Sequence, residues 1–134
     1  MNSTEGSQKK ILVIDDDPDF LEFLKTLLVD NGYAVVGATD GQQGVDQARK
    51  ENPDLISLDI TMPEKSGVGS YRDLKTDPEL AKIPVIIVTG VSDDFKDYIS
   101  RRKQVPPPEG YIAKPIEEAE YLGTIAELLK PGSF

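Results

Sequence analysis

The sequence predicts a single α/β domain in which helices cover both faces of a parallel β-sheet. Two observations support this prediction. Short runs rich in Ile, Val and Leu alternate with segments of helical periodicity, and the 134 residues suffice for one domain with its own core. Apolar runs without polar alternation are typical of strands buried on both faces. Because such strands alternate with helices along the chain, we expect parallel pairing.

The five predicted strands are short runs of aliphatic and β-branched residues that stop at a polar residue, glycine or proline. They cover residues 11–14, 34–36, 55–58, 83–88 and 110–113. The third strand runs directly into Asp59, and the fourth ends at Thr89. Lys114 and Pro115 close the fifth strand.

The first predicted helix follows Asp17, which can cap it, and has Pro18 at its first position. Asn31 and Gly32 should end it. Its apolar residues recur at the spacing of one helix face, so we expect them to face the core. These residues are Phe20, Phe23, Leu24, Leu27 and Leu28.

Four more helices are expected, at about 42–50, after residue 67, at 93–103 and at 117–129. Their apolar residues should face the sheet. These residues are Val45, Ala48, Tyr71, Leu74, Phe95, Tyr98, Ile99, Leu122, Ile125, Ala126 and Leu129. We expect residues 1–8 to be a disordered tail and 132–134 a short C-terminal tail, which leaves one domain over residues 9–131.

The composition excludes several classes of function. Fifteen basic and twenty-four acidic residues give a net charge of −9, which disfavours direct binding of nucleic acid. The chain has no cysteine and no histidine, so disulfides, thiolate or imidazole zinc sites and Ser-His-Asp catalysis are excluded. Neither a signal peptide nor a membrane span is evident, so we expect a cytoplasmic protein with no membrane partner.

Polar residues follow four of the predicted strands. Asp15 and Asp16 come after the first strand, Asp59 after the third, Thr89 after the fourth and Lys114 after the fifth. In open parallel sheets, ligands bind beyond the carboxyl ends of the strands. We therefore expect three carboxylates, one hydroxyl and one ammonium group to converge at one edge of the sheet.

This set of groups suits phosphoryl chemistry. Close carboxylates repel one another unless a cation intervenes, and Mg²⁺ prefers oxygen ligands. Asp59 could attack phosphorus as a nucleophile, while Lys114 and Mg²⁺ stabilise charge and Thr89 hydrogen-bonds a phosphoryl oxygen. Taken singly, each group has a plainer interpretation, such as helix capping by Asp15 or Asp17. Their coincidence at four strand ends favours a functional site.

Four segments carry a family resemblance. They are ILVIDDDP at 11–18, LDITMP at 58–63 with Gly67, IPVIIVTG at 83–90 and YIAKP at 111–115. In this order they resemble the response-regulator receiver family over about residues 9–130. The resemblance implies a single flavodoxin-like (βα)5 domain with a doubly wound sheet of five strands in the order 2-1-3-4-5.

The resemblance also implies a role for each site residue. Asp59 is similar to the phosphoacceptor, with Asp15 and Asp16 as the acidic pair for Mg²⁺. The backbone carbonyl of Thr61 would complete the metal shell. Thr89 and Tyr111 resemble the switch residues, and Lys114 the phosphoryl-binding lysine. A cis Lys114–Pro115 bond is expected as well.

The implied activity is signalling by a stand-alone receiver domain. A sensor histidine kinase or a histidine phosphotransfer protein would donate the phosphoryl group to Asp59 in a Mg²⁺-dependent reaction. Transfer and later hydrolysis would be self-catalysed, so the chain is not expected to be an enzyme with a separate substrate. The face formed by the helix at 93–103, the fifth strand and the last helix would then switch and bind an unidentified effector. Dimerisation on phosphorylation and an origin in a longer protein stay open.

Three other functions compete with this interpretation. A phosphorylation-independent interaction module on the same fold has its best support in the long stretch between Thr89 and Lys114, which contains prolines 106–108. Such a module could lose the acidic pair, the acceptor or the lysine, and the presence of all of them argues against it. A small-molecule phosphohydrolase would typically have a second aspartate at position 61, where this chain has Thr61. A flavin or nucleotide binder would need a glycine-rich loop after the first strand, where three aspartates stand instead.

Overall fold

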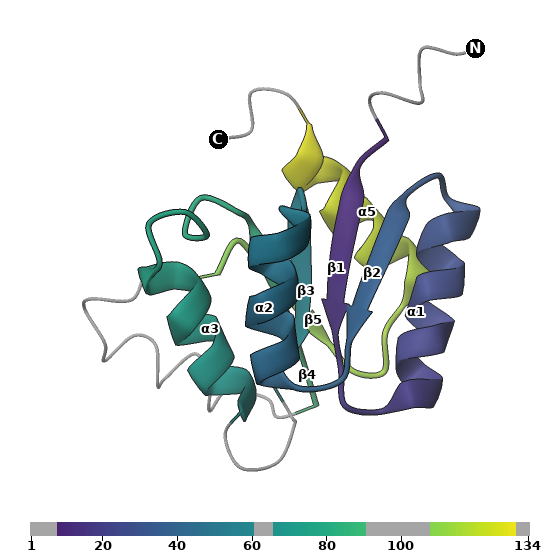
Figure 1. Ribbon diagram of the computed structural model, residues 1–134. Helices are drawn as coiled ribbons and strands as arrows, with labels where there is room; N and C mark the ends of the chain where they lie inside the picture. The colour runs from purple at the N-terminus through teal and green to yellow at the C-terminus, as the bar shows by residue number, and fades with distance from the viewer. Residues whose placement is uncertain (1–7, 61–65, 91–107, 131–134) are drawn as a thin grey trace.

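A computed structural model describes residues 8–60, 66–90 and 108–130. Within these ranges, five parallel strands form one sheet in the order β2-β1-β3-β4-β5 (Figure 1), which confirms the order that the resemblance implied. The strands are β1 (Lys10–Ile14), β2 (Ala34–Ala38), β3 (Leu55–Asp59), β4 (Val85–Thr89) and β5 (Gly110–Ala113). The predicted helix at 93–103, Thr61 and most of the predicted tails lie outside the described residues.

Helices cover both faces of the sheet, as a doubly wound flavodoxin-like fold requires. The described helices are α1 (Pro18–Asp30), α2 (Gly41–Glu51), α3 (Ser66–Thr76) and α5 (Glu118–Leu129). Helices α2 and α3 lie on one face, and α1 and α5 lie on the other (Figure 1).

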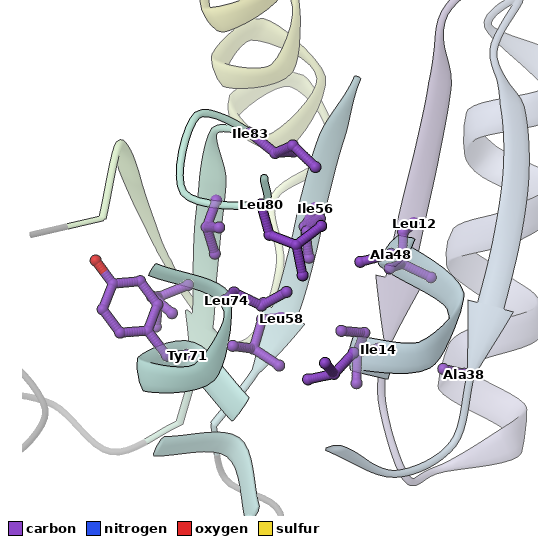
Figure 2. Close-up of a cluster of buried hydrophobic side chains, with 13 residues drawn as sticks. Leu12, Ile14, Ala38, Ala48, Ile56, Leu58, Tyr71, Leu74, Leu80 and Ile83 are labelled. Carbon is purple, nitrogen blue, oxygen red and sulfur yellow. The ribbon is translucent and has the colours of Figure 1, made fainter. Parts of the chain in front are cut away.

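Alternation of side chains along the strands divides the core into two clusters. In one cluster, Leu12 and Ile14 of β1 pack with residues of α2 and α3, and Figure 2 shows these side chains between the sheet and the helices. In the other, Ile11 and Val13 pack with residues of α1 and α5. We call them the α2/α3 cluster and the α1/α5 cluster. The central strands are thus buried on both faces, as their apolar runs predicted.

The predicted ends of α1 are confirmed. The Asp17 carboxylate accepts hydrogen bonds from the backbone N–H groups of Asp19 and Phe20 at 3.0 and 3.3 Å. At the other end, Asn31 is the C-cap and Gly32 has a φ of 94°, a left-handed conformation that glycine adopts without strain. These caps fix where the chain leaves the carboxyl end of β1 and enters α1.

Two predicted helix faces were partly wrong. In α1, Leu21 is buried while Phe23 is 42% exposed, so the inward stripe is aliphatic and the aromatic ring lies on its flank. In α5, Ala126 is exposed and Tyr121 is fully buried. Tyr121 can be buried because its hydroxyl donates a 2.8 Å hydrogen bond to Ser57 of β3.

A buried ion pair joins α3 to the start of β5. The Lys75 ammonium group lies 2.9 Å from both carboxylate oxygens of Glu109, and the Lys75 side chain is only 1% exposed. Glu109 also accepts a 2.8 Å hydrogen bond from the backbone N–H of Val85, the first residue of β4. The pair therefore fixes the amino ends of β4 and β5 side by side.

Candidate functional site

The predicted site residues in the described ranges come together at the carboxyl end of the sheet. Asp59 is the last residue of β3 and pairs with Val88 of β4, while Asp15 directly follows β1. Ligand oxygens of Asp15, Asp16 and Asp59 all lie within 4.8 Å of one another. Asp15 and Asp59 are buried, and Asp16 is exposed. The parallel topology brings these carboxylates together from two strand ends.

Asp15 is held firmly but has one unsatisfied oxygen. Its backbone N–H donates to the carbonyl of Ala38 at 3.0 Å, and its Oδ1 accepts from the backbone N–H of Asp17 at 2.9 Å. Its Oδ2 is buried and has no hydrogen-bond partner among the described residues. Burial raises the pKa of Asp15 to about 6, and the negative charges of Asp59 and Asp16 add to this rise. A cation beside Oδ2 would relieve both effects.

Lys114 is the cation of the site. It follows β5, and its backbone N–H donates to the carbonyl of Thr89 at 2.9 Å. Its Nζ donates to Asp59 Oδ2 at 3.1 Å. The same Nζ lies 4.8 Å from the centre of the Phe20 ring. The Lys114–Pro115 bond is cis, as predicted.

Thr89 and Tyr111 flank these charged groups. Thr89 ends β4 and is buried at 6% exposure. Tyr111 of β5 pairs with Ile87 and packs, partly buried, against the α2/α3 cluster. Burial raises the pKa of the Tyr111 hydroxyl, so this phenol stays neutral at ordinary pH. The switch roles of Thr89 and Tyr111 stay predictions.

Sequence reasoning missed two features near the site. One is the hydrogen bond between Tyr121 and Ser57, which stands two residues before Asp59 in β3. A serine inside an apolar strand needs a buried hydrogen-bond partner, and that was the available signal. The contact between Phe20 and Lys114 was missed because Phe20 was expected to be ordinary core packing. The one hint was that Phe20 stands close to the capping residue Asp17, at the end of α1 that is nearest to the carboxyl ends of the strands.

Comparisons with known proteins agree with this geometry. The family model of the response regulator receiver domain matches residues 11–126. The chain is 38% identical over 120 residues to the protein PilH of Pseudomonas aeruginosa, which covers 90% of this chain and 97% of PilH. It is 35% identical over 121 residues to the polar-differentiation response regulator DivK of Brucella ovis, covering 90% of this chain and 96% of DivK.

Solved structures show the same likeness. The signal receiver domain of a signal transduction histidine kinase from Syntrophus aciditrophicus has a TM-score of 0.79 and 32% identity, and covers 90% of this chain and 89% of that chain. A CheY-like response regulator receiver domain protein from Methanospirillum hungatei has a TM-score of 0.79 and 27% identity, and covers 91% of this chain and 94% of that chain.

The chain belongs to the response regulator receiver domain family, the signalling domains of two-component systems. Receiver domains bind Mg²⁺ at an acidic pocket and interact with kinases or phosphotransfer proteins and with downstream effectors. The family assignment disfavours the phosphohydrolase and nucleotide-binding alternatives. None of the helices in the described ranges has the length and apolar character that crossing a membrane would need.

Proposed function

We propose that this chain is a phosphoacceptor that receives a phosphoryl group on Asp59 with the help of Mg²⁺ and Lys114. The observation that carries the proposal is the 3.1 Å contact between Lys114 and Asp59 beside two further aspartates. A buried carboxylate with a cation at hydrogen-bond distance is a positioned nucleophile with charge stabilisation already in place.

The transfer step uses the side chains of this edge. A carboxylate oxygen of Asp59 forms a bond to phosphorus while the bond from phosphorus to the leaving group breaks, and the leaving group keeps the electron pair. With a phosphohistidine donor, the leaving atom is an imidazole nitrogen of the sensor kinase or phosphotransfer protein. Lys114 stabilises the charge on the transferring oxygens. Attack of water on phosphorus later releases phosphate and restores Asp59.

The acidic residues fit a magnesium ion. Asp15 Oδ2 is a buried oxygen that lacks a hydrogen-bond partner in the described structure, and three carboxylates near one ammonium group leave excess negative charge. Asp15, Asp16 and Asp59 would hold the ion, with the backbone carbonyl of Thr61 as a further ligand. Bound there, Mg²⁺ would neutralise the carboxylates and the transferring phosphoryl group.

The output is a change in a protein-binding surface. A phosphoryl group on Asp59 would draw in the Thr89 hydroxyl and Lys114, and Tyr111 would repack beside Ile87. The surface that includes β5 and α5 would then bind or release an effector protein in the cytoplasm. We do not assign DNA or a membrane as a direct partner, because the chain carries a net charge of −9.

Intact mass tests the proposal. The natural chain is incubated with acetyl phosphate with and without Mg²⁺, beside Asp59→Asn and a control, Asp46→Asn, which alters an exposed carboxylate of α2. We expect one added phosphoryl group that requires Mg²⁺ and Asp59 and persists in the control. If the natural chain stays unmodified under every condition, the phosphorylation-independent interaction module becomes the better interpretation.

A further inference from the structure

The ring of Phe20 lies at the charged edge rather than in the centre of the core. Its residue is only partly buried at the start of α1, where it packs against the α1/α5 cluster. The Lys114 Nζ lies 4.8 Å from the ring centre, within the range of an attractive contact between a cation and an aromatic face. The same Nζ is 3.1 Å from Asp59 Oδ2. Lys114 is thus held between a carboxylate and an aromatic face.

The Phe20 ring has a second aromatic contact. Phe20 stacks on Phe23, with ring centroids 5.8 Å apart and an interplanar angle of 29°. The backbone N–H of Phe20 donates to the capping carboxylate of Asp17. The ring of Phe20 therefore contacts both Phe23 and Lys114, and its backbone belongs to the capped first turn of α1.

An aromatic face suits this place better than a carboxylate would. A fourth carboxylate would add negative charge to the site and compete with the phosphoryl group for the ammonium. A ring face attracts the ammonium group more weakly and forms no hydrogen bond that must break. Lys114 has four rotatable carbon–carbon bonds in its stem, so a second contact reduces the conformations it explores.

We infer that Phe20 is a positioning residue, whose ring face holds the Lys114 ammonium group beside Asp59 before phosphoryl transfer. This inference rests on the proposed function of Lys114 and Asp59. It assigns to Phe20 an electrostatic role that a purely apolar side chain of similar size cannot fill.

Graded fluorination of the ring separates this role from packing. Phenylalanines with one, two and three fluorines keep nearly the same shape but withdraw electron density from the ring face. We expect the rate of Mg²⁺-dependent modification by acetyl phosphate to fall stepwise along the series at Phe20, reaching a loss of about threefold to tenfold. Phe20→Leu should lose a similar amount, and Phe20→Tyr should retain most of the rate. The same fluorine series at Phe23, whose ring stacks on Phe20, is the matched control and should change the rate much less than the series at Phe20.

Nuclear magnetic resonance tests the contact between Phe20 and Lys114 without a phosphoryl-transfer reaction. Ring currents should shift the side-chain protons of Lys114 upfield in the natural chain, and Phe20→Leu should abolish that shift while Phe23→Leu preserves most of it. Lys114 protons that do not respond to Phe20→Leu would overturn the inference, as would a natural chain that is modified at Asp59 but shows a flat fluorine series. Failure of the natural chain to be modified would instead contradict the proposed function, and the proton shifts would still decide whether the ring holds Lys114.

Discussion

A pair of one lysine and one carboxylate lies at each end of β5, and the two pairs differ in how fully their hydrogen-bonding groups are satisfied. At the amino end, Lys75 lies 2.9 Å from both oxygens of Glu109 and also donates to the carbonyl of Ile83 at 3.3 Å. At the carboxyl end, Lys114 is 3.1 Å from one oxygen of Asp59, and further carboxylates lie close by.

This difference separates a structural pair from the proposed phosphorylation site. The pair of Lys75 and Glu109 balances one positive with one negative charge and uses its hydrogen-bonding groups inside the protein. The carboxyl edge gathers more negative than positive charge, and Asp15 Oδ2 has no partner within the described ranges. Unbalanced charge and a raised pKa are typical of sites that bind a ligand. Two lysines paired with carboxylates in one small domain can therefore serve different purposes.

Replacing Lys75, the cation at the amino end of β5, should give the largest loss of stability. Lys75→Met leaves the Glu109 carboxylate without its cation, so we expect the free energy of unfolding to fall by about 3 kcal/mol. Urea unfolding followed by circular dichroism measures it. Lys82→Met, at an exposed lysine near the same end, is the matched control and should change the value by less than about 0.5 kcal/mol. Equal losses of stability in the two variants would contradict a structural role for the pair of Lys75 and Glu109.

Removing a carboxylate from the other end should instead stabilise the protein in the absence of divalent cations. The folded-state pKa of Asp15, about 6, lies above its ordinary value of 3.8, so folding becomes harder as the pH rises through this interval. Asp15→Asn should therefore raise the free energy of unfolding at pH 7 by about 2 kcal/mol, and by much less at pH 4. Urea unfolding of both chains in EDTA between pH 4 and pH 7 would measure this difference in the free energy of unfolding.

Mg²⁺ provides the control for that prediction. In the natural chain, added Mg²⁺ should raise the midpoint of thermal unfolding, because binding to the folded state stabilises it. In Asp15→Asn the rise should be much smaller. A natural chain that is destabilised by acidification from pH 7 to pH 5 in EDTA would contradict the predicted role of Asp15.

The hydroxyl pair between β3 and α5 should have an intermediate effect. Tyr121→Phe removes the 2.8 Å hydrogen bond to Ser57 in a fully buried place, and we expect a loss of about 1 kcal/mol. Ser57→Ala should cost a similar amount, since it leaves the Tyr121 hydroxyl unsatisfied. The double variant should be less destabilised than the sum of the two, and a double-mutant cycle by urea unfolding checks this coupling.

Replacing Lys114, the cation at the carboxyl end of β5, should have the smallest effect on stability and a large effect on function. We expect Lys114→Ala to change the free energy of unfolding by less than about 1 kcal/mol, because Lys114 is partly exposed. Phosphorylation of Asp59 should no longer shift the backbone amide resonances of β5 and α5, and it should no longer change affinity for an effector. Normal shifts in this variant would contradict the switching role of Lys114.

The comparison also shows what sequence reasoning could reach. The strands and the gathering of Asp15, Asp59, Thr89 and Lys114 were predictable, because residues that follow parallel strands must meet at one edge. The ends of α1 were predictable from Asp17, Pro18 and Gly32, since capping is local chemistry. The helix ends depend on residues adjacent in the chain, and the gathering of the site residues depends on topology alone.

Contacts between distant side chains were not predictable in the same way. Lys75 and Glu109 are 34 residues apart, and nothing in either local segment indicates the pairing. The rotation of α1 that exposes Phe23 follows from how its aliphatic row fits against the sheet, which periodicity alone does not fix. Tyr121 was missed because its burial depends on a hydroxyl partner supplied by another strand.

The proposed function depends above all on Asp59 accepting the phosphoryl group. The most direct measurement is to treat the chain with acetyl phosphate and Mg²⁺, reduce it with borohydride, and locate homoserine by peptide mass spectrometry, because borohydride converts an aspartyl phosphate to homoserine. We predict homoserine at position 59, and none at position 59 when Mg²⁺ is omitted. Homoserine at another aspartate, or at no aspartate of the natural chain, would contradict the account.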